Sequence, residues 1–155
     1  MKLYIARHGH AVSNAENPSR PLSAAGTAEI ERMAAFMADA GVRLHRVVHS
    51  GKTRAMQTAT IYARVLGKAE KIEKLDGLKP EDDPAVTARV IQELSSDTLI
   101  AGHLPHLDRL VALLATGNSE LPLLSLPTGA VVCLEREGYR DGWQITWMLE
   151  PSLIG

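Results

Sequence analysis

The 155-residue chain has little of what marks several classes of protein. It has one cysteine, which excludes an internal disulfide; Cys133 lies in the apolar run 130–134, where we expect a buried structural thiol rather than a nucleophile. Aromatic residues make up only 4% of the chain. That is too few for the stacking surface that is usual in proteins binding single-stranded nucleic acid.

The sequence also has no excess of one charge and no long apolar run. Lys and Arg number 17 and Asp and Glu number 18, for a net charge of −1, so no global field attracts nucleic acid or an anionic membrane. No stretch approaches the roughly 20 apolar residues of a membrane helix, and the first apolar run, 3–6, is too short for a signal peptide. We expect a cytoplasmic protein whose anion sites are local.

What is present suits a single globular unit. Hydrophobic residues make up 45% of the chain and charged residues 23%, which is ordinary for such a protein. A chain of this length holds one sizeable core. We therefore predict one domain over residues 1–155, without a large helical lid, and a monomer.

Short apolar runs and helical patterns alternate along the chain. Runs at 3–6, 46–48 and 98–101 indicate buried strands. Helices are predicted after each run and between the second and third, at about 23–40, 51–67, 84–94 and 105–117. This alternation is typical of parallel α/β proteins.

Local signals set the ends of these helices. Ser23 and Asp83 are good N-caps, and Pro84 is a good first residue. Glycines are expected to end the first, second and fourth helices, at Gly41, Gly67 and Gly117. For the third helix, the spacing predicts these inward-facing residues: Val86, Val90, Ile91 and Leu94.

The C-terminal part contains two strand-like runs, 130–135 and 144–149, joined through 138–142. A short connection without a helix predicts an antiparallel hairpin at the edge of the sheet. Trp143 and Trp147 are predicted to share a face and to serve in packing. The expected fold is three-layer α/β/α, with a mostly parallel sheet of about six strands.

Basic residues follow all three predicted parallel strands. The segments are 7–9 (RHG), 49–54 (HSGKTR) and 102–105 (GHLP). Because ligands of open parallel sheets bind outside the carboxyl ends of the strands, we expect the three segments to meet at one edge. Planar guanidinium groups and helix N-termini both suit an anion such as phosphate.

Histidine is the nucleophile that remains for phosphoryl transfer at this edge. The chain has no plausible catalytic cysteine and no Asp in the first loop, so His8 is the best-placed candidate. Its imidazole must be neutral to attack, which requires one ring nitrogen to donate to a fixed acceptor such as a loop carbonyl. Nearby arginines favour that neutral form.

Three spaced motifs resemble the histidine phosphatase superfamily, also called phosphoglycerate mutase-like. They are RHG at 7–9, HSGKTRAxQT at 49–58 and GHLP at 102–105. The ordered match spans residues 2–114. RPLS at 20–23 followed by Gly26, together with the short chain, is most similar to the SixA-type phosphohistidine phosphatases.

The resemblance implies a metal-independent, cofactor-free hydrolase that works in two steps. His8 would accept the phosphoryl group and water would release it, while Arg7, Arg54 and His103 hold the phosphate oxygens. By the same resemblance Arg20 matches an arginine before Pro-Leu, and Asn14 matches a phosphate-contacting asparagine of the wider superfamily. Both are expected to bind the phosphate.

The chain also departs from the family pattern. His10 stands where an acidic or amide residue is common, and Gly51 stands where proline is common. No general acid can be assigned; the candidates lie in the acidic loop: Asp76, Glu81, Asp82 and Asp83. Since imidazole leaves more easily than an alkoxide, a site without a strong acid favours P–N over P–O bonds. The expected substrate is a phosphorylated protein, such as a histidine phosphotransfer domain.

Three alternatives stay open. A small-molecule phosphomonoesterase of the same superfamily would recruit Asp76 or Glu81 as its acid. A metalloprotein would use the spacings HGH at 8–10 and HLPH at 103–106. A non-catalytic phosphate or phosphoprotein binder would keep the cationic clamp without turnover. The other histidines are expected to be structural or on the surface: His45, His49 and His106.

Overall fold

Strands and helices alternate along the chain until the last two strands, which follow one another directly. The structure is a computed structural model that describes residues 1–67, 72–138 and 142–155. The elements in chain order are β1 (Lys2–Arg7), α1 (Ala24–Asp39), β2 (Arg46–His49), α2 (Thr53–Leu66), β3 (Ile72–Lys74), α3 (Pro84–Gln92), β4 (Thr98–Gly102), α4 (His106–Thr116), β5 (Val131–Glu135), β6 (Gln144–Leu149) and a short 3-10 helix η2 (Pro151–Leu153).

The six strands form a sheet in the order β3-β2-β4-β1-β5-β6. The first four strands of this order run parallel to one another, whereas β5 is antiparallel to β1 and β6 is antiparallel to β5. The predicted fold class and the predicted edge hairpin are therefore confirmed. The carboxyl ends of β1, β2 and β4 lie next to one another, which brings the three basic segments to one edge.

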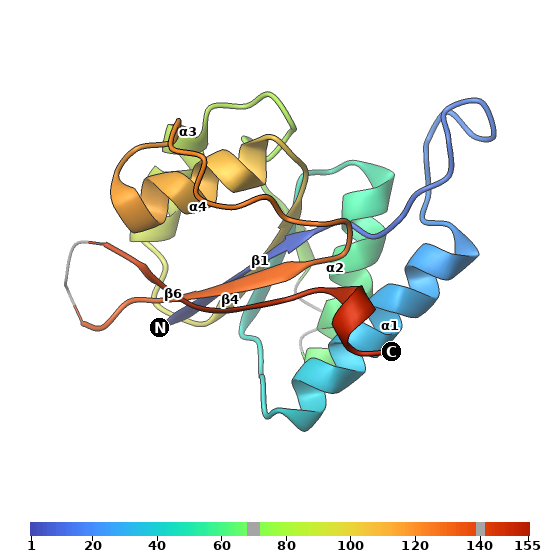
Figure 1. Cartoon of the computed structure of the whole chain (residues 1–155), viewed down its shortest axis with the longest axis horizontal. Coiled ribbons are helices and arrows are strands. Elements are labelled where there is room, and N and C mark those ends of the chain that lie inside the picture. Colours follow the sequence, from blue (N-terminus) through green and yellow to red (C-terminus); the bar gives the residue numbers. More distant parts are fainter. Residues whose placement is uncertain (68–71, 139–141) are drawn as a thin grey trace.

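Helices cover both faces of the sheet, α1 and α2 on one side and α3 and α4 on the other (Figure 1). Alternation along β1 divides its side chains between the two cores. Tyr4 and Ala6 pack under α1 and α2, while Leu3 and Ile5 pack under α3 and α4. Cys133 is fully buried, as predicted. In the described part of the chain, no helix combines the length and the apolar character needed to cross a membrane.

Capping and glycine geometry set most helix ends where the sequence predicted them. The Ser23 hydroxyl accepts from the Gly26 amide at 3.0 Å, and the Asp83 carboxylate accepts from the Ala85 amide at 2.9 Å. Gly67 and Gly117 take left-handed conformations (φ 108° and 80°) at the ends of α2 and α4.

Two local predictions differ from the structure. Helix α2 begins at Thr53 rather than near Gly51, because the positive φ of Gly51 (93°) forms a turn before the helix. In α3, Val86 is 41% exposed and Val90 is only half-buried, whereas Thr87 faces inward with Ile91. Thr87 can occupy the inward position because its hydroxyl donates to the Gly77 carbonyl at 2.9 Å.

The prediction that Trp143 and Trp147 share a face is wrong. Trp147 packs with the α1 and α2 core and Trp143 with the α3 and α4 core. Cys133 pairs with Trp147, but Leu134 pairs with Ile145, so one extra residue bulges out of β6 and reverses the alternation. The predicted connection 138–142 includes 139–141, which lie outside the described residues.

Candidate active site

His8 lies directly after β1, and hydrogen bonds determine the tautomer of its ring. Its Nδ1 is 2.7 Å from the Gly9 carbonyl oxygen. A carbonyl can only accept, so Nδ1 carries the proton and Nε2 keeps a free lone pair. The main chain of His8 is held by its neighbours: its amide donates to the Gly102 carbonyl at 3.0 Å, and its carbonyl accepts from the Gly129 amide at 3.1 Å.

The surroundings of His8 favour the neutral imidazole. Burial is the largest cause that lowers its pKa, to about 4, and the hydrogen bond to Gly9 opposes this. The positive charges of Arg54, Arg7 and Arg20 lower the pKa further. The sequence predicted the arginine effect but not that burial exceeds it. At neutral pH the ring is uncharged and Nε2 can attack an electrophile.

Close packing between the first loop and two helices holds this region in place. A Cβ on Gly26 of α1 would lie 2.1 Å from the His10 carbonyl oxygen, so only glycine permits the contact. From α2, the Thr58 hydroxyl accepts from the Gly9 amide at 3.1 Å and donates to the Arg54 carbonyl at 2.8 Å. Thr58 thus connects the chain beside His8 to the first turn of α2.

Arg7 and Arg54 bring two guanidinium groups to the same edge. One terminal nitrogen of Arg7 donates to the Leu126 carbonyl at 2.9 Å. The Leu126 amide in turn donates to the Asp108 carboxylate at 3.0 Å, which ties the support of Arg7 to α4. The Nε atoms of Arg7 and Arg54 are buried and have no hydrogen-bond partner within the described ranges. Burial, followed by repulsion from Arg20, lowers the pKa of Arg54.

His103 follows β4 and faces His8, with 5.1 Å between the ring centroids. Its Nε2 is 2.6 Å from the hydroxyl of Ser50, which is also buried. The other ring nitrogen, Nδ1, is buried without a partner among the residues that the structure describes. Burial lowers the pKa of His103 to about 3; repulsion between the protonated forms of His103 and His8, and the positive charges of Arg54 and Lys52, contribute. The free protein therefore offers a neutral ring here.

The two expected phosphate-binding residues of the first loop differ in position. Arg20 adopts a positive φ of 48°, and its Nε donates to the Val12 carbonyl at 3.2 Å. Its charge lowers the pKa of both His8 and Arg54. Arg20 therefore lies near the phosphate cluster. This cluster consists of Arg7, His8, Arg54 and His103. Asn14 is exposed, and within residues 1–67, 72–138 and 142–155 no hydrogen bond joins it to the cluster.

Two helices begin at this edge without a side-chain cap. The N-caps of α2 and α4 are Lys52 and Pro105, and neither side chain accepts a hydrogen bond from its helix. The amides of the first turns are therefore not neutralised by a side chain and can add positive potential to that of the arginines. This agrees with the predicted use of these two helix openings for an anion.

Three of the four acidic candidates have partners elsewhere, and the fourth, Glu81, is exposed. Asp76 is 94% exposed and pairs with Lys74 at 3.6 Å; Asp82 accepts from the Lys79 amide at 2.9 Å, and Asp83 caps α3. No carboxylate is among the groups that shift the pKa of His8 or His103. Within the described residues, no three His, Cys, Asp or Glu side chains cluster as metal ligands.

The remaining histidines have structural or surface positions, as predicted. His49 Nδ1 accepts from the Gly51 amide at 3.0 Å, and His45 is exposed. His106 is fully buried, and its Nε2 lies 3.1 Å from the Thr87 hydroxyl. That hydroxyl already donates to the Gly77 carbonyl, so it accepts from His106, which fixes the Nε2–H tautomer.

Sequence reasoning gave no role to three side chains that support the cluster: Ser50, Gln57 and Thr58. Gln57 accepts from the Leu22 amide at 2.7 Å and so ties α2 to the loop that carries Arg20. All three lie within the motif at 49–58. Their identity was visible there, but their partners are distant in the sequence.

A family model described as histidine phosphatase superfamily (branch 1) matches residues 3–81. The chain is also 30% identical over 156 residues to phosphohistidine phosphatase SixA of Escherichia coli (strain K12), covering 97% of this chain and 94% of that protein. The chain belongs to the histidine phosphatase superfamily. The three sequence motifs that resemble this superfamily, at 7–9, 49–58 and 102–105, begin at the carboxyl ends of β1, β2 and β4.

Solved structures place this histidine phosphatase among its relatives. A structure of the protein histidine phosphatase SixA complexed with tungstate matches with a TM-score of 0.90 and 29% identity, covering 100% of both chains. A phosphoserine phosphatase from Entamoeba histolytica, in complex with 3-phosphoglyceric acid, matches with a TM-score of 0.71 and 13% identity over 95% of each chain. The second likeness concerns the fold alone.

Proposed function

We propose that this chain is a phosphohistidine phosphatase that removes the phosphoryl group from a histidine of another protein. The reaction passes through a phosphohistidine on His8, while Arg7, Arg54 and His103 hold the phosphate oxygens. Arg20 adds positive charge beside them. The SixA proteins named above support this choice of substrate, and the geometry of the strand ends supports the chemistry.

One observation carries the proposal: three buried nitrogens of the cluster have no hydrogen-bond partner among the described residues, namely Arg7 Nε, Arg54 Nε and His103 Nδ1. A buried donor without a partner costs about 1–3 kcal/mol. The Ser50 hydroxyl can donate to His103 Nε2, which leaves the proton on Nδ1. All three nitrogens are then donors, and phosphate oxygens are the acceptors they lack.

In the first step, His8 Nε2 attacks phosphorus opposite the leaving nitrogen. The new N–P bond forms as the substrate's P–N bond breaks, and the bonding pair goes to the substrate imidazole, which takes up a proton from solvent. The arginines hold the three equatorial oxygens, where charge accumulates. The Gly9 carbonyl accepts the Nδ1 proton throughout and stabilises the ring as it becomes cationic.

In the second step, water attacks the phosphoryl group on His8. The water oxygen becomes part of phosphate, its proton passes to solvent, and the N–P electrons return to Nε2. The low pKa of His8 favours the uncharged ring as the leaving group. Neither step requires a strong carboxylic acid, in agreement with the surroundings of His8 and His103.

Trapping the intermediate tests the proposal. A histidine phosphotransfer domain labelled with ³²P is mixed with the wild-type protein, and the label is followed after acid and base quenching. We expect label on His8 that survives base and is lost in acid. His8→Ala should lower turnover by more than about 1000-fold, as removal of a nucleophile does, yet retain tungstate binding. His45→Ala, a change at an exposed histidine, should leave turnover unchanged.

The same assay separates the alternatives. Faster turnover of sugar phosphates than of the phosphohistidine protein would identify a small-molecule phosphomonoesterase. Tungstate binding without turnover of either substrate would identify a binding domain. A loss of activity in chelator, restored by a metal ion, would overturn the metal-independent mechanism.

A further inference from the structure

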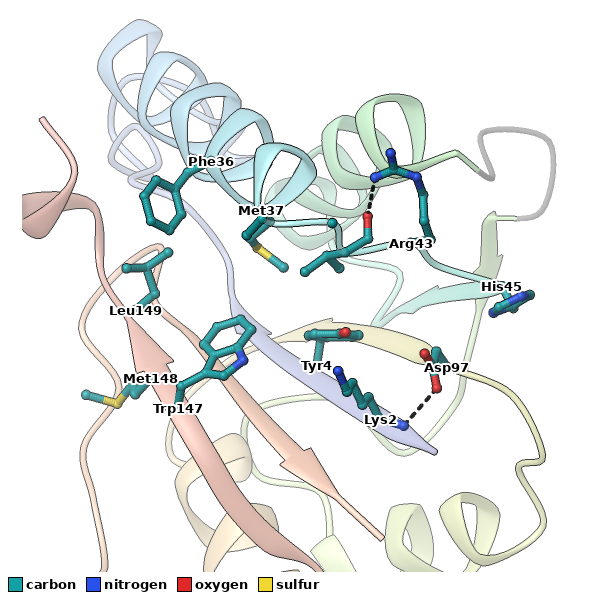
Figure 2. A pocket seen from close by; sticks show the side chains of 13 residues that line it. Lys2, Tyr4, Phe36, Met37, Arg43, His45, Asp97, Trp147, Met148 and Leu149 are labelled. Carbon is teal, nitrogen blue, oxygen red and sulfur yellow. Dashed lines mark hydrogen bonds between the residues drawn. The ribbon is translucent and has the colours of Figure 1, made fainter. Parts of the chain in front are cut away.

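A second pocket lies away from the phosphate cluster, between the C-terminal half of α1 and the strands β1 and β6. Its volume is about 470 Å³, which suits a small organic ligand. Phe36 and Met37 of α1 line one side, and Tyr4, Trp147 and Leu149 line the sheet side (Figure 2). These side chains give the pocket a mostly apolar lining with three aromatic rings.

The pocket lies toward the amino end of β1, whereas His8 follows the carboxyl end of the same strand. Lys2, at the pocket, and Arg7, at the cluster, are the first and last residues of β1. At roughly 3.3 Å per residue they are about 16 Å apart along the strand. A ligand in this pocket would therefore not occupy the phosphate site.

Three polar groups at the pocket have no partner within the described part of the protein and are open to a ligand. Among the described residues, no hydrogen bond is formed by the Tyr4 hydroxyl, the Trp147 indole N–H or the Lys2 ammonium group. Tyr4 is only 3% exposed, and burial, followed by the electrostatic effects of Cys133 and Asp97, raises the pKa of its hydroxyl, which remains protonated at neutral pH. Figure 2 shows the Lys2 side chain extending toward the space between Tyr4 and Trp147.

The charges around the pocket favour an anionic ligand. Asp97 is the one carboxylate that the described residues contribute to the lining, and its Oδ1 already accepts from the Lys2 amide at 2.8 Å. Arg43 also lines the pocket; one of its terminal nitrogens donates to the Val42 carbonyl at 2.8 Å and to the Ala38 carbonyl at 3.4 Å, and the other has no partner among the described residues. Lys2 and Arg43 form no ion pair within the described residues.

We propose that this pocket binds a small molecule composed of a flat apolar ring system and a carboxylate. The ring would lie against Trp147 and Met37, and the carboxylate would accept from the Tyr4 hydroxyl, the Trp147 indole N–H and the Lys2 ammonium group. The ring and the carboxylate of the ligand are each complementary to one part of the pocket. The apolar side chains bury the ring, and the available donors, beside the net positive charge of Lys2, Arg43 and Asp97, bind the carboxylate.

The test uses 2-naphthoate as the probe and NMR of the ¹⁵N-labelled full chain. The chain has two tryptophans, so its indole N–H groups give two signals. We expect 2-naphthoate to shift the Trp147 signal in a saturable manner and to leave Trp143, which lies on the other face of the sheet, unchanged. The neutral 2-naphthamide should bind about ten-fold more weakly, since it lacks the charge that strengthens hydrogen bonds.

Two mild variants test the individual contacts. Tyr4→Phe removes only a hydroxyl and should weaken 2-naphthoate binding by about five-fold. Lys2→Met keeps the backbone bond to Asp97 and should weaken binding by a similar factor. Lys79→Met, a lysine outside the pocket, is the matched control and should not change affinity. Phosphatase turnover should be the same in all three variants, which also shows that they are folded.

Equal affinity for 2-naphthamide and 2-naphthoate would overturn the proposal, because apolar contact alone would then explain binding. Equal shifts of both tryptophan signals would place the probe elsewhere and overturn it too. So would the absence of any shift at millimolar probe with turnover intact. The readout is independent of the proposed phosphatase function, so a failure of one leaves the other standing.

Discussion

Of the four α-helices in the described residues, two begin with a side-chain cap and two begin without one. The Ser23 hydroxyl caps α1 and the Asp83 carboxylate caps α3, whereas the N-caps of α2 and α4, Lys52 and Pro105, leave their helices without a side-chain acceptor. The uncapped helices are the ones that open beside His8 and His103.

The difference between capped and uncapped helix starts shows which part of the protein lacks local stabilising interactions. A cap contributes about 0.5–2 kcal/mol, and a paired buried donor about 1 kcal/mol. At the phosphate cluster the structure lacks both contributions: two helix openings are uncapped, and Arg7 Nε and Arg54 Nε are buried without partners in the described residues. An anion that binds there would satisfy them together. This contrast leads to three predictions about the cluster and the helix starts.

The largest effect is expected from Arg54→Lys in the first turn of α2. Lysine keeps the positive charge but cannot reach two phosphate oxygens with a planar fork. We expect kcat/KM to fall by about 100-fold, the scale seen when one preorganised donor is lost. Steady-state kinetics with the phosphohistidine protein measures the change.

Arg43→Lys is the matched control for Arg54→Lys, since Arg43 lies at the second pocket rather than at the cluster. It should leave kcat/KM unchanged. Wild-type kcat/KM in Arg54→Lys would show that charge alone suffices there and that the fork has no role.

A smaller effect concerns the pH dependence of stability. Burial is the largest cause that lowers the pKa of His8 and His106 to about 4 and of His103 to about 3. Unfolded histidines bind a proton near pH 6.5, so between about pH 6.5 and pH 4 the unfolded chain binds more protons than the folded one. The free energy of unfolding should therefore decrease as pH falls through this window, as measured by urea midpoints.

His106→Gln separates one of these contributions from the others. Gln can still donate to the Thr87 hydroxyl but cannot titrate, so the decrease in urea midpoint between pH 7 and pH 5 should become shallower. His45→Gln, at an exposed position, is the control and should keep the wild-type slope. A variant His106→Gln with the full wild-type slope would contradict the attribution to buried histidines.

The fold was largely predictable because its signals are local. Apolar runs gave β1, β2 and β4, and caps or glycines such as Ser23 and Gly67 gave the helix ends. Strand β3 was not located, because its three residues are half-buried or exposed and carry no apolar pattern. The faces of the sheet on which Trp143 and Trp147 lie could not be predicted, because they depend on a bulge in β6. The bulge arises from the pairing of β6 with β5, and the residues of β6 alone do not indicate it.

Some features of the phosphate cluster could likewise be predicted from the sequence and others could not. His8, Arg7, Arg54 and His103 could be proposed because each stands in a motif beside a strand end, and the structure gathers these four. The tautomer of His8 could be expected, but the size of the burial effect on its pKa could not. The contact of Ser50 with His103 joins residues 53 positions apart, and a sequence gives no distance between them.

The smallest effect tests the contrast between helix starts directly. Lys52 has the extended conformation of an N-cap (φ −71°, ψ 142°), so the hydroxyl of Lys52→Ser can accept an amide of α2. We expect the free energy of unfolding to rise by about 0.5–1 kcal/mol, while kcat/KM falls several-fold, because a cation is lost and an amide is no longer available to the anion. Ser23→Ala reverses the pattern at α1: stability should fall by about 1 kcal/mol with unchanged kcat/KM. If Lys52→Ser gained stability at no cost to turnover, the open start of α2 would have no part in binding phosphate.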